Sequence, residues 1–456
     1  MQPADPAGRQ AGAVRGGHLR RDRHDRWVAG ARRRPLDARA ARPPDRPHRI
    51  AAHAVAPHDH RAAACRRPGG RDRERRGERA RRADGAGAAG AGVHLYVHVP
   101  FCQRRCSYCD FSIAVRKRIP AREYVEAIVG EALRGPDGAV ETVYLGGGTP
   151  SLLPAGVIRE LLHELTQKFR ISHSALPIEM TLEANPEDVT PTNARAWVSA
   201  GINRVSLGAQ SFDDTVLKWM HRSHGAARIG AAMHALRGAG IENISLDLIF
   251  ALPEELHRDW ERDLDMALAL RPTHLSLYGL TVEPRTPLER WISRGATRAP
   301  DDDRYAEEYL TAHRRLTTED YQFYEVSNAA LPGFRSRHNS AYWSGRPYVG
   351  LGPAAHSFDG TTRRWNLRAW EAYRRAIAEG RSPVESEERL TEDQKELEAI
   401  YLGLRTVEGL PLSALRRLPP PFAAQGWIEV SADRVKCTPE GWLRLDSLAM
   451  HTETQS

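Results

Sequence analysis

Cysteine is scarce in this 456-residue chain, and its scarcity limits the chemistry open to the protein. The five cysteines are Cys65, Cys102, Cys106, Cys109 and Cys437. An odd and sparse set, in a sequence without a secretory-signal pattern, excludes a disulfide framework. It indicates a reducing cytoplasm and metal ligation. Long apolar runs are lacking too: no stretch approaches the ~20 residues of a transmembrane helix, so we expect no membrane span.

A net positive charge is lacking from most of the chain, although the formal net charge of the whole sequence is +8. The first 92 residues hold 23 Arg, no Lys and 10 acidic residues, a net of +13, which leaves −5 for the remainder. A mildly acidic folded part gives no reason to expect a nucleic-acid partner.

Residues 1–92 also lack Ser, Thr, Asn, Tyr and Phe, and their few large apolar residues follow no helix or strand period. Such a segment cannot bury enough surface to offset its ordering entropy, so we predict a disordered extension rich in Arg, Ala and Pro. It is either a basic arm for nucleic acid or anionic lipid, or upstream sequence translated from a start codon placed too early. We favour the second interpretation.

From Val93 onward, short β-rich runs alternate with amphipathic helical patterns. The runs lie at 93–99, 142–148, 178–184, 203–209, 244–250 and 274–280, and helices are expected at 121–134, 157–169, 226–237 and 259–270. Six strand–helix units predict an α/β fold with a parallel sheet rolled towards a barrel. Because a closed barrel of this type has eight units, we expect a partial six-stranded (β/α)6 barrel over residues 93–330.

The pattern loosens beyond the barrel. We expect a further strand at 321–328, and then a long loop at 334–358 within a barrel extension that spans residues 331–385. Residues 386–456 predict a smaller helical, winged-helix-like domain, with a second short helix near 412–418 and a hairpin over 426–442. Its candidate recognition segment is interrupted by three prolines at 419–421, which disfavours DNA binding.

Three of the cysteines form a C-x3-C-x2-C pattern, Cys102, Cys106 and Cys109, in the loop after the first strand. Active sites of such barrels lie at the carboxyl ends of the strands. Three thiolates can hold three corners of a cubane iron–sulfur cluster and leave one iron open to a small molecule. The alternative is zinc, which needs a fourth ligand such as His98 or Cys437. We favour the cluster.

With an aromatic residue before its last cysteine, this pattern resembles the signature of radical S-adenosylmethionine (SAM) enzymes. The resemblance implies a [4Fe-4S] cluster whose open iron binds SAM. The segment "GGGTPS" at 146–151 resembles the motif that holds the amino group of SAM in that family. Gly147 and Gly148 would allow close approach of a ligand and offer N–H donors.

Several longer motifs resemble the oxygen-independent coproporphyrinogen III oxidase superfamily from residue 93 to about 450. Positions for a first SAM match Tyr96, Gly148, Thr149 and Glu183, and positions that line a second SAM match Tyr108, Gln210, Arg222 and Asp247. A charged Asp247 within a buried strand is costly unless it is paired. It therefore either faces a polar interior or forms an ion pair with Arg222.

Within that superfamily the chain resembles the HemW-type haem chaperones. The oxidase has a further cysteine two residues after the third, whereas here Asp110 and Phe111 follow Cys109. "HNSAYW" (338–343) and "YVGLGPAAHSF" (348–358) match the chaperone branch as well. His338 or His356 could supply an axial nitrogen to haem, and Tyr342 and Trp343 offer flat surfaces to the macrocycle. Alternatively, these side chains only brace the loop.

The resemblance implies a cytoplasmic protein that binds a [4Fe-4S] cluster, SAM and haem, and delivers haem to acceptor apo-haemoproteins. Respiratory enzymes at the membrane as acceptors, and a homodimer as the assembly, remain open. The enzymatic alternative is oxidation of coproporphyrinogen III to protoporphyrinogen IX by radical SAM chemistry. A zinc-stabilised nucleic-acid protein is a distant third.

Overall fold

The computed structural model describes residues 93–171, 177–417 and 420–454. The expected extension at 1–92, with Cys65, lies outside the described residues.

Six parallel strands form the centre of the main sheet. In their spatial order they are β1 (Val93–Val99), β4 (Ala139–Gly147), β6 (Glu179–Ala184), β7 (Arg204–Gln210), β8 (Asn243–Phe250) and β9 (His274–Gly279). All neighbouring pairs are parallel, which confirms the six strands expected from the sequence. Their carboxyl ends therefore meet at one edge of the sheet, where the cysteine loop also begins.

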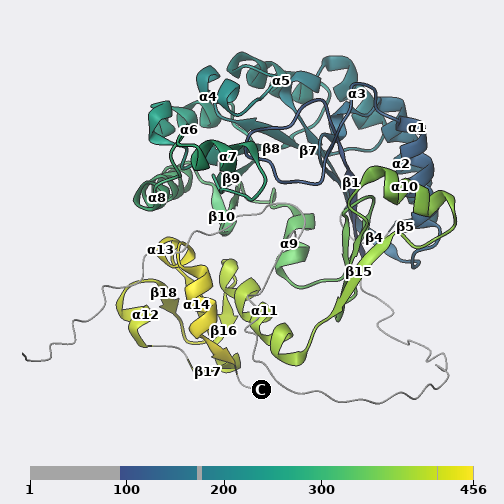
Figure 1. Ribbon diagram of the computed structural model, residues 1–456. Coiled ribbons are helices and arrows are strands. Elements are labelled where there is room, and N and C mark those ends of the chain that lie inside the picture. The colour runs from purple at the N-terminus through teal and green to yellow at the C-terminus, as the bar shows by residue number, and fades with distance from the viewer. Residues whose placement is uncertain (1–92, 172–176, 418–419, 455–456) are drawn as a thin grey trace, which may run out of the picture. The chain divides into compact units, whose positions relative to one another are not determined.

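Helices follow the strands and lie outside the arc that the strands form (Figure 1). They are α1 (Ala121–Ala132), α2 (Ala155–Lys168), α3 (Pro191–Ser199), α4 (Asp214–Trp219), α5 (Ala226–Gly238) and α6 (Trp260–Ala269). Each buries one apolar face, as Leu161 and Leu165 of α2 illustrate. Side-chain caps mark several starts; Thr190 accepts a hydrogen bond from the Asn193 N–H, and Asp259 from the Arg262 N–H.

The sheet is extended at both edges and does not close. Beyond β1 lie β12 (Tyr348–Leu351), β13 (His356–Phe358), β14 (Thr362–Asn366) and β15 (Val384–Arg389). Beyond β9 lie β11 (Asn328–Ala330) and β10 (Gln322–Glu325). Among the described strands, β10 and β15 end the order and do not pair with each other, so the barrel is open as predicted.

The long loop expected at 334–358 is wrong. This stretch contains helix α9 (Arg337–Trp343), β12 and β13. Strand β12 pairs in parallel with β1, and His338, Asn339, Ala341 and Tyr342 of α9 are buried. The glycine, proline and polar residues of this stretch have weak helix and strand propensity, so the sequence did not predict these elements. Pairing with the distant strand β1 stabilises β12 despite that weak local propensity.

Shorter elements complete the barrel. They are β2 (Phe101–Cys102), β3 (Ala114–Val115), β5 (Arg170–Ile171), the 3-10 turns η1 (Pro150–Leu152), η2 (Pro186–Asp188) and η3 (Glu254–Leu256), and helices α7 (Pro287–Ser293), α8 (Asp302–Thr318) and α10 (Trp370–Ala378).

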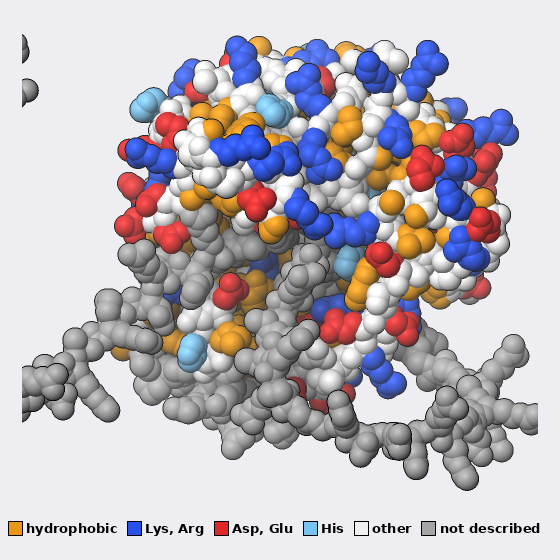
Figure 2. Space-filling model, viewed as in Figure 1, with side chains coloured by type: hydrophobic (Ala, Val, Ile, Leu, Met, Phe, Trp, Pro, Cys, Tyr) orange, Lys and Arg blue, Asp and Glu red, His pale blue; other side chains and the backbone are white. Residues whose placement is uncertain are grey.

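Figure 2 shows basic side chains spread over the visible face alongside acidic ones. No helix among the described residues has the length and apolarity to cross a membrane.

A smaller helical part follows at the C-terminal end. It contains α11 (Glu392–Arg405), β16 (Leu410–Pro411), η4 (Leu412–Ala414), β17 (Leu415–Arg417), α12 (Pro420–Ala424), β18 (Ile428–Val430), β19 (Arg434–Cys437), α13 (Pro439–Trp442), α14 (Leu445–His451) and β20 (Glu453–Thr454). The hairpin expected at 426–442 is present as β18 and β19, followed by α13. The helix expected near 412–418 is wrong, since that stretch forms a 3-10 turn and a short strand.

Candidate functional site

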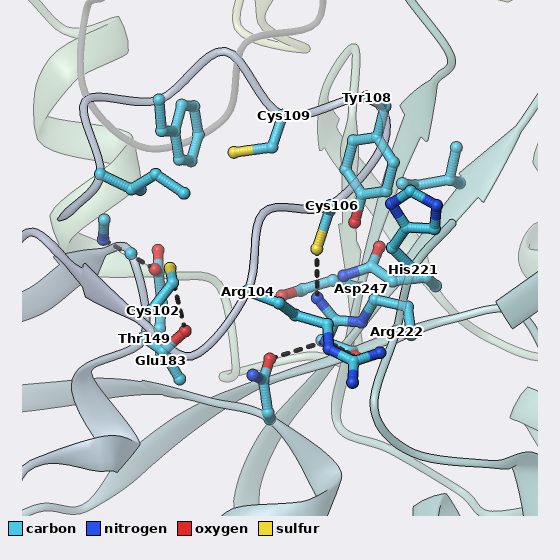
Figure 3. Close-up of a pocket in the computed structure, with 18 of the residues that line it drawn as sticks. Cys102, Arg104, Cys106, Tyr108, Cys109, Thr149, Glu183, His221, Arg222 and Asp247 are labelled. Carbon is cyan, nitrogen blue, oxygen red and sulfur yellow. Dashed lines mark hydrogen bonds between the residues drawn. The ribbon is translucent and has the colours of Figure 1, made fainter. Parts of the chain in front are cut away.

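The three cysteines of the first loop line one cavity at the carboxyl edge of the barrel. Cys102 ends β2, while Cys106 and Cys109 lie in the loop that runs on to β3. The loop is fixed at its middle, because the Ser107 N–H donates to the Met220 carbonyl at 3.1 Å and its carbonyl accepts from the Leu288 N–H at 2.9 Å. Figure 3 shows the three thiols approaching the pocket from different directions. The cavity encloses about 240 Å³.

Two of these thiols, Cys102 and Cys109, lie in surroundings that disfavour their ionisation. Burial raises the pKa of Cys102 to about 11 and that of Cys109 to about 12. Two groups partly oppose burial at Cys102: the hydroxyl of Thr149, 3.4 Å from its sulfur, and the positive charge of Arg222. Nη1 of Arg222 also lies 3.7 Å from the Cys106 sulfur. Iron, when bound, would favour the thiolate form, because metal ligation requires it.

A single zinc ion would need a fourth ligand beside the three cysteines, and His98 and Cys437 are the two side chains considered for that place. His98, the first proposed fourth ligand, has both ring nitrogens engaged, by the Tyr96 hydroxyl at 3.0 Å and the Ser112 carbonyl at 3.1 Å. Cys437, the second, lies in β19 of the C-terminal part. Neither placement favours a fourth zinc ligand, so the cluster is the better interpretation of the three cysteines.

The glycine segment after β4 packs tightly against the first strand and its loop. Gly147 has φ +110°, and a Cβ there would lie 2.5 Å from the His98 ring. A Cβ at Gly148 would lie 2.7 Å from the Phe101 carbonyl oxygen. The expected N–H donors are already used: Gly147 donates to Glu183 at 2.9 Å and Gly148 to the Val99 carbonyl at 2.8 Å. Both glycines line the cavity, but they serve close packing rather than N–H donation to a ligand.

Glu183, at the end of β6, faces the same cavity. The Tyr144 hydroxyl donates to one carboxyl oxygen at 2.9 Å, and the Gly147 N–H donates to the other at 2.9 Å. Burial raises its pKa to about 8, and the nearby Asp247 acts in the same direction. A buried carboxyl held by two donors is a rigid hydrogen-bonding group for ligand hydroxyls.

Arg222 lines the cavity beside the cysteine loop (Figure 3). Its Nη2 donates to the side chain of Asn185 at 2.7 Å and to the Gly208 carbonyl at 2.8 Å. Its Nε is buried and has no hydrogen-bond acceptor. Together with the contact to Cys106, this orphaned donor beside the thiols suits an electron-rich cluster, so the side chains present fit the group that the sequence implies.

Asp247, in β8, also faces the cavity, as expected for a charged residue in a polar interior. The Ser206 hydroxyl lies 2.9 Å from one of its oxygens, and the Ser245 hydroxyl lies 3.1 Å from the same oxygen. Burial raises its pKa to about 6. The ion pair with Arg222 that we considered is wrong, because each side chain has other partners.

Four further residues were expected to contact SAM. Tyr108, Thr149 and Gln210 line the cavity, and Gln210 has φ +67° where β7 ends. Tyr96 is not among the lining residues. It is buried within the barrel, stacked on Tyr144 with ring centroids 6.1 Å apart. It therefore packs behind the residues that line the cavity. A Cβ at Gly146 would lie 3.0 Å from its ring.

The four expected haem residues do not form one site. His338 is fully buried; its Nδ1 lies 2.7 Å from the Thr142 hydroxyl and its Nε2 lies 2.9 Å from the Tyr342 hydroxyl. No ring nitrogen is left for iron, so we no longer propose His338 as an axial ligand. His356 stacks on Trp365 in the extension, with ring centroids 5.8 Å apart. Tyr342 and Trp343 line a second cavity.

Sequence reasoning missed the side chains that hold the expected site in place. Asn185 fixes Arg222, Ser206 fixes Asp247, and Tyr144 orients Glu183. Asn185 follows Glu183 by two residues and comes directly after β6, so its position beside the strand end was a usable signal. Ser206 and Tyr144 lie inside strands, and only the pairing of neighbouring strands brings them to their partners.

Comparison with known protein families agrees with this geometry. Residues 96–267 match the model of the radical SAM superfamily, and residues 390–444 match that of the HemN C-terminal domain. The fold and the site thus define a radical SAM protein, and this membership implies a [4Fe-4S] cluster and SAM. The solved coproporphyrinogen III oxidase of Escherichia coli shares the fold, with a TM-score of 0.67 at 23% identity over 79% of this chain and 89% of that chain.

Curated relatives give a narrower assignment. The chain is 37% identical over 368 residues to the haem chaperone HemW of Mycobacterium tuberculosis, covering 78% of this chain and 93% of the relative. It is 33% identical over 376 residues to HemW of Escherichia coli, covering 78% and 97%. HemW of Bacillus subtilis is 33% identical over 321 residues, covering 69% and 84%. The chain belongs to the family of HemW haem chaperones.

Proposed function

We propose that this protein is a haem chaperone that binds a [4Fe-4S] cluster and SAM, and delivers haem to acceptor haemoproteins. The observation that carries the proposal is the cavity in which Cys102, Cys106 and Cys109 meet Glu183 and Arg222. The printed function of the relatives, which align over most of their length, supports the haem cargo.

Each group at the cavity has a role in this proposal. Cys102, Cys106 and Cys109 would hold the cluster, and an iron without a protein ligand would be open to SAM. The cluster, when bound, can supply an electron that splits the sulfonium of SAM. Arg222 balances the negative charge of the thiolates through its contact with Cys106. Glu183 hydrogen-bonds the hydroxyls of SAM, while Thr149, Gly147 and Gly148 shape the wall next to it.

Tyr108, Gln210 and Asp247 complete the proposed binding surface on the side of β7 and β8. A cytoplasmic location is part of the proposal, because the sparse cysteines suit a reducing compartment. We also propose that the acceptors include respiratory enzymes at the membrane, and that the protein forms a homodimer. The domain limits 93–330, 331–385 and 386–456 are likewise proposals; the HemN C-terminal match at 390–444 falls within the last.

The test uses the full chain with its cluster reconstituted under anaerobic conditions. We expect it to bind hemin and to transfer it to an apo-haemoprotein, with no conversion of coproporphyrinogen III when SAM and a reductant are supplied. Protoporphyrinogen IX formed with consumption of SAM would replace the chaperone by the oxidase. Asp110 and Phe111, which stand where the oxidase signature continues to a further cysteine, favour the first outcome.

A further inference from the structure

A second cavity lies between α9 and α11, away from the cysteine loop. It encloses about 360 Å³, within the range of small-molecule sites. One wall comes from the barrel extension, between Tyr342 and Arg363, and the other comes from the start and body of α11, between Leu390 and Gly403. The C-terminal part therefore supplies the second wall of the cavity.

The lining is aromatic and apolar over much of its area. Tyr342, Trp343, Tyr348 and Phe358 come from the extension, and α11 adds Leu402. Tyr342 and Tyr348 pack edge to face, with ring centroids 4.7 Å apart. Large, flat side chains on one wall and aliphatic side chains on the other favour a planar, apolar ligand.

The lining also carries an excess of positive charge. Arg346, Arg363 and Lys395 line the cavity, against Glu398 as the acidic residue of the lining. Arg363 pairs with Glu398 at 2.5 Å, and Lys395 pairs with the exposed Glu392 at 2.9 Å. Guanidinium and ammonium groups at an aromatic cavity suit carboxylates attached to a flat ligand.

Two lining side chains have buried donors without acceptors: the indole N–H of Trp343 and the Nε–H of Arg363. Unpaired buried donors are rare because desolvation is not compensated, and a ligand that accepts hydrogen bonds would satisfy them. The wall that carries them is fixed in place, since Glu141 holds Arg346 through two contacts of 2.8 and 2.9 Å, and His338 holds the Tyr342 hydroxyl.

We propose that this second cavity is the haem site, with the macrocycle between the aromatic wall and α11 and its carboxylates at Arg363 and Lys395. The proposal rests on the haem-chaperone function and adds its location. It gives the C-terminal part a role in holding the cargo, and it makes His338 a support of the wall rather than an iron ligand.

The first experiment fills the cavity. Ala399 lines it from an exposed position on α11, whereas Leu397, exposed on the same helix, does not line it. We expect Ala399→Trp to weaken hemin binding at least tenfold in a spectroscopic titration of the reconstituted full chain. Leu397→Trp should bind as wild type does, and both variants should keep wild-type iron and sulfide contents. Wild-type affinity in Ala399→Trp would overturn the location.

The second experiment tests the carboxylate contacts and does not depend on the fit of a tryptophan. Arg363→Gln should weaken binding of hemin several-fold but leave binding of hemin dimethyl ester, which lacks free carboxylates, unchanged. Arg364→Gln is the matched control, because Arg364 pairs with Asp359 and Glu387 and does not line the cavity. Equal hemin affinities of the two variants would contradict the proposal.

The two hypotheses fail in different ways. If wild-type protein does not bind hemin, both the haem-chaperone function and this site are wrong. If wild-type protein binds hemin, and both Ala399→Trp and Arg363→Gln bind it equally well, the chaperone function stands and haem is held elsewhere.

Discussion

The imidazole of His338 stacks on the phenol ring of Tyr144, with ring centroids 5.0 Å apart and planes at 28°. Tyr144 donates its hydroxyl hydrogen bond to Glu183, which lines the cysteine cavity. His338 holds the hydroxyl of Tyr342, which lines the second cavity. The two cavities are thus joined through the barrel interior by three successive side-chain contacts.

His338→Ala should destabilise the protein without removing an iron ligand. The substitution removes the partner of the Tyr342 hydroxyl and one of the two partners of the Thr142 hydroxyl, which keeps its contact with His94 at 2.9 Å. It also opens a void, and together these losses cost about 2–4 kcal/mol of unfolding free energy. Urea denaturation should show this loss. Hemin binding should weaken through displacement of Tyr342, while the absorption spectrum of the bound haem keeps its wild-type shape. Unchanged stability combined with a changed Soret band would restore His338 as a ligand.

Replacement of Cys102, Cys106 or Cys109 by Ala should abolish the cluster, because two thiolates do not hold a cubane. Iron and sulfide analysis after anaerobic reconstitution measures the effect. Cys437→Ala is the control: that cysteine is buried in β19, so its loss should lower stability but leave iron and sulfide at wild-type levels. A brown, iron-loaded Cys106→Ala protein would show that the ligand assignment is wrong.

Gly147→Ala should disrupt the wall beside the cysteine loop. A methyl group there meets the His98 ring at 2.5 Å, and the backbone has φ +110°, so we expect a loss of about 2–4 kcal/mol and poor cluster loading. Gly156→Ala, in α2, is the control, since a Cβ there meets nothing within 4 Å. It should raise stability by up to about 1 kcal/mol. Thermal unfolding of both variants would reveal the contrast, and equal effects would contradict it.

Asp247→Asn should flatten part of the pH dependence of stability. The pKa of Asp247 is raised from 3.8 to about 6, so the folded state binds its proton more tightly than the unfolded chain does. The contribution of this group to the free energy of unfolding is complete below pH ~4. It falls as the pH rises to about 6 and stays constant above that pH. The neutral amide, which the Ser206 and Ser245 hydroxyls can still bond, removes this fall.

At pH 7 the Asp247→Asn variant of the cluster-free protein should therefore be more stable than wild type, by up to about 3 kcal/mol. At pH 4 the two should be nearly equal. Urea denaturation at pH 4, 5, 6 and 7 measures both. A difference that is the same at every pH would show that Asp247 is not the titrating group.

The sequence by itself determined the barrel and the place of its site. Alternating β-rich runs and amphipathic helices predict six parallel strands, and strands of one direction must end at one edge. That rule places Cys102, Glu183 and Asp247 near one another without knowledge of any contact. The cysteine spacing predicts the cluster ligands, because ligand type and spacing are local properties of the chain.

Only the tertiary structure decided which polar groups satisfy one another. The sequence predicted that the N–H groups of Gly147 and Gly148 would donate to a ligand, but they donate to Glu183 and to the Val99 carbonyl. Asp247 accepts hydrogen bonds from serines rather than pairing with Arg222. His338 looks like a ligand in sequence, yet both its nitrogens are used inside the barrel. Hydrogen bonding between distant strands has no sequence period, so burial and partners emerge only when the sheet is assembled.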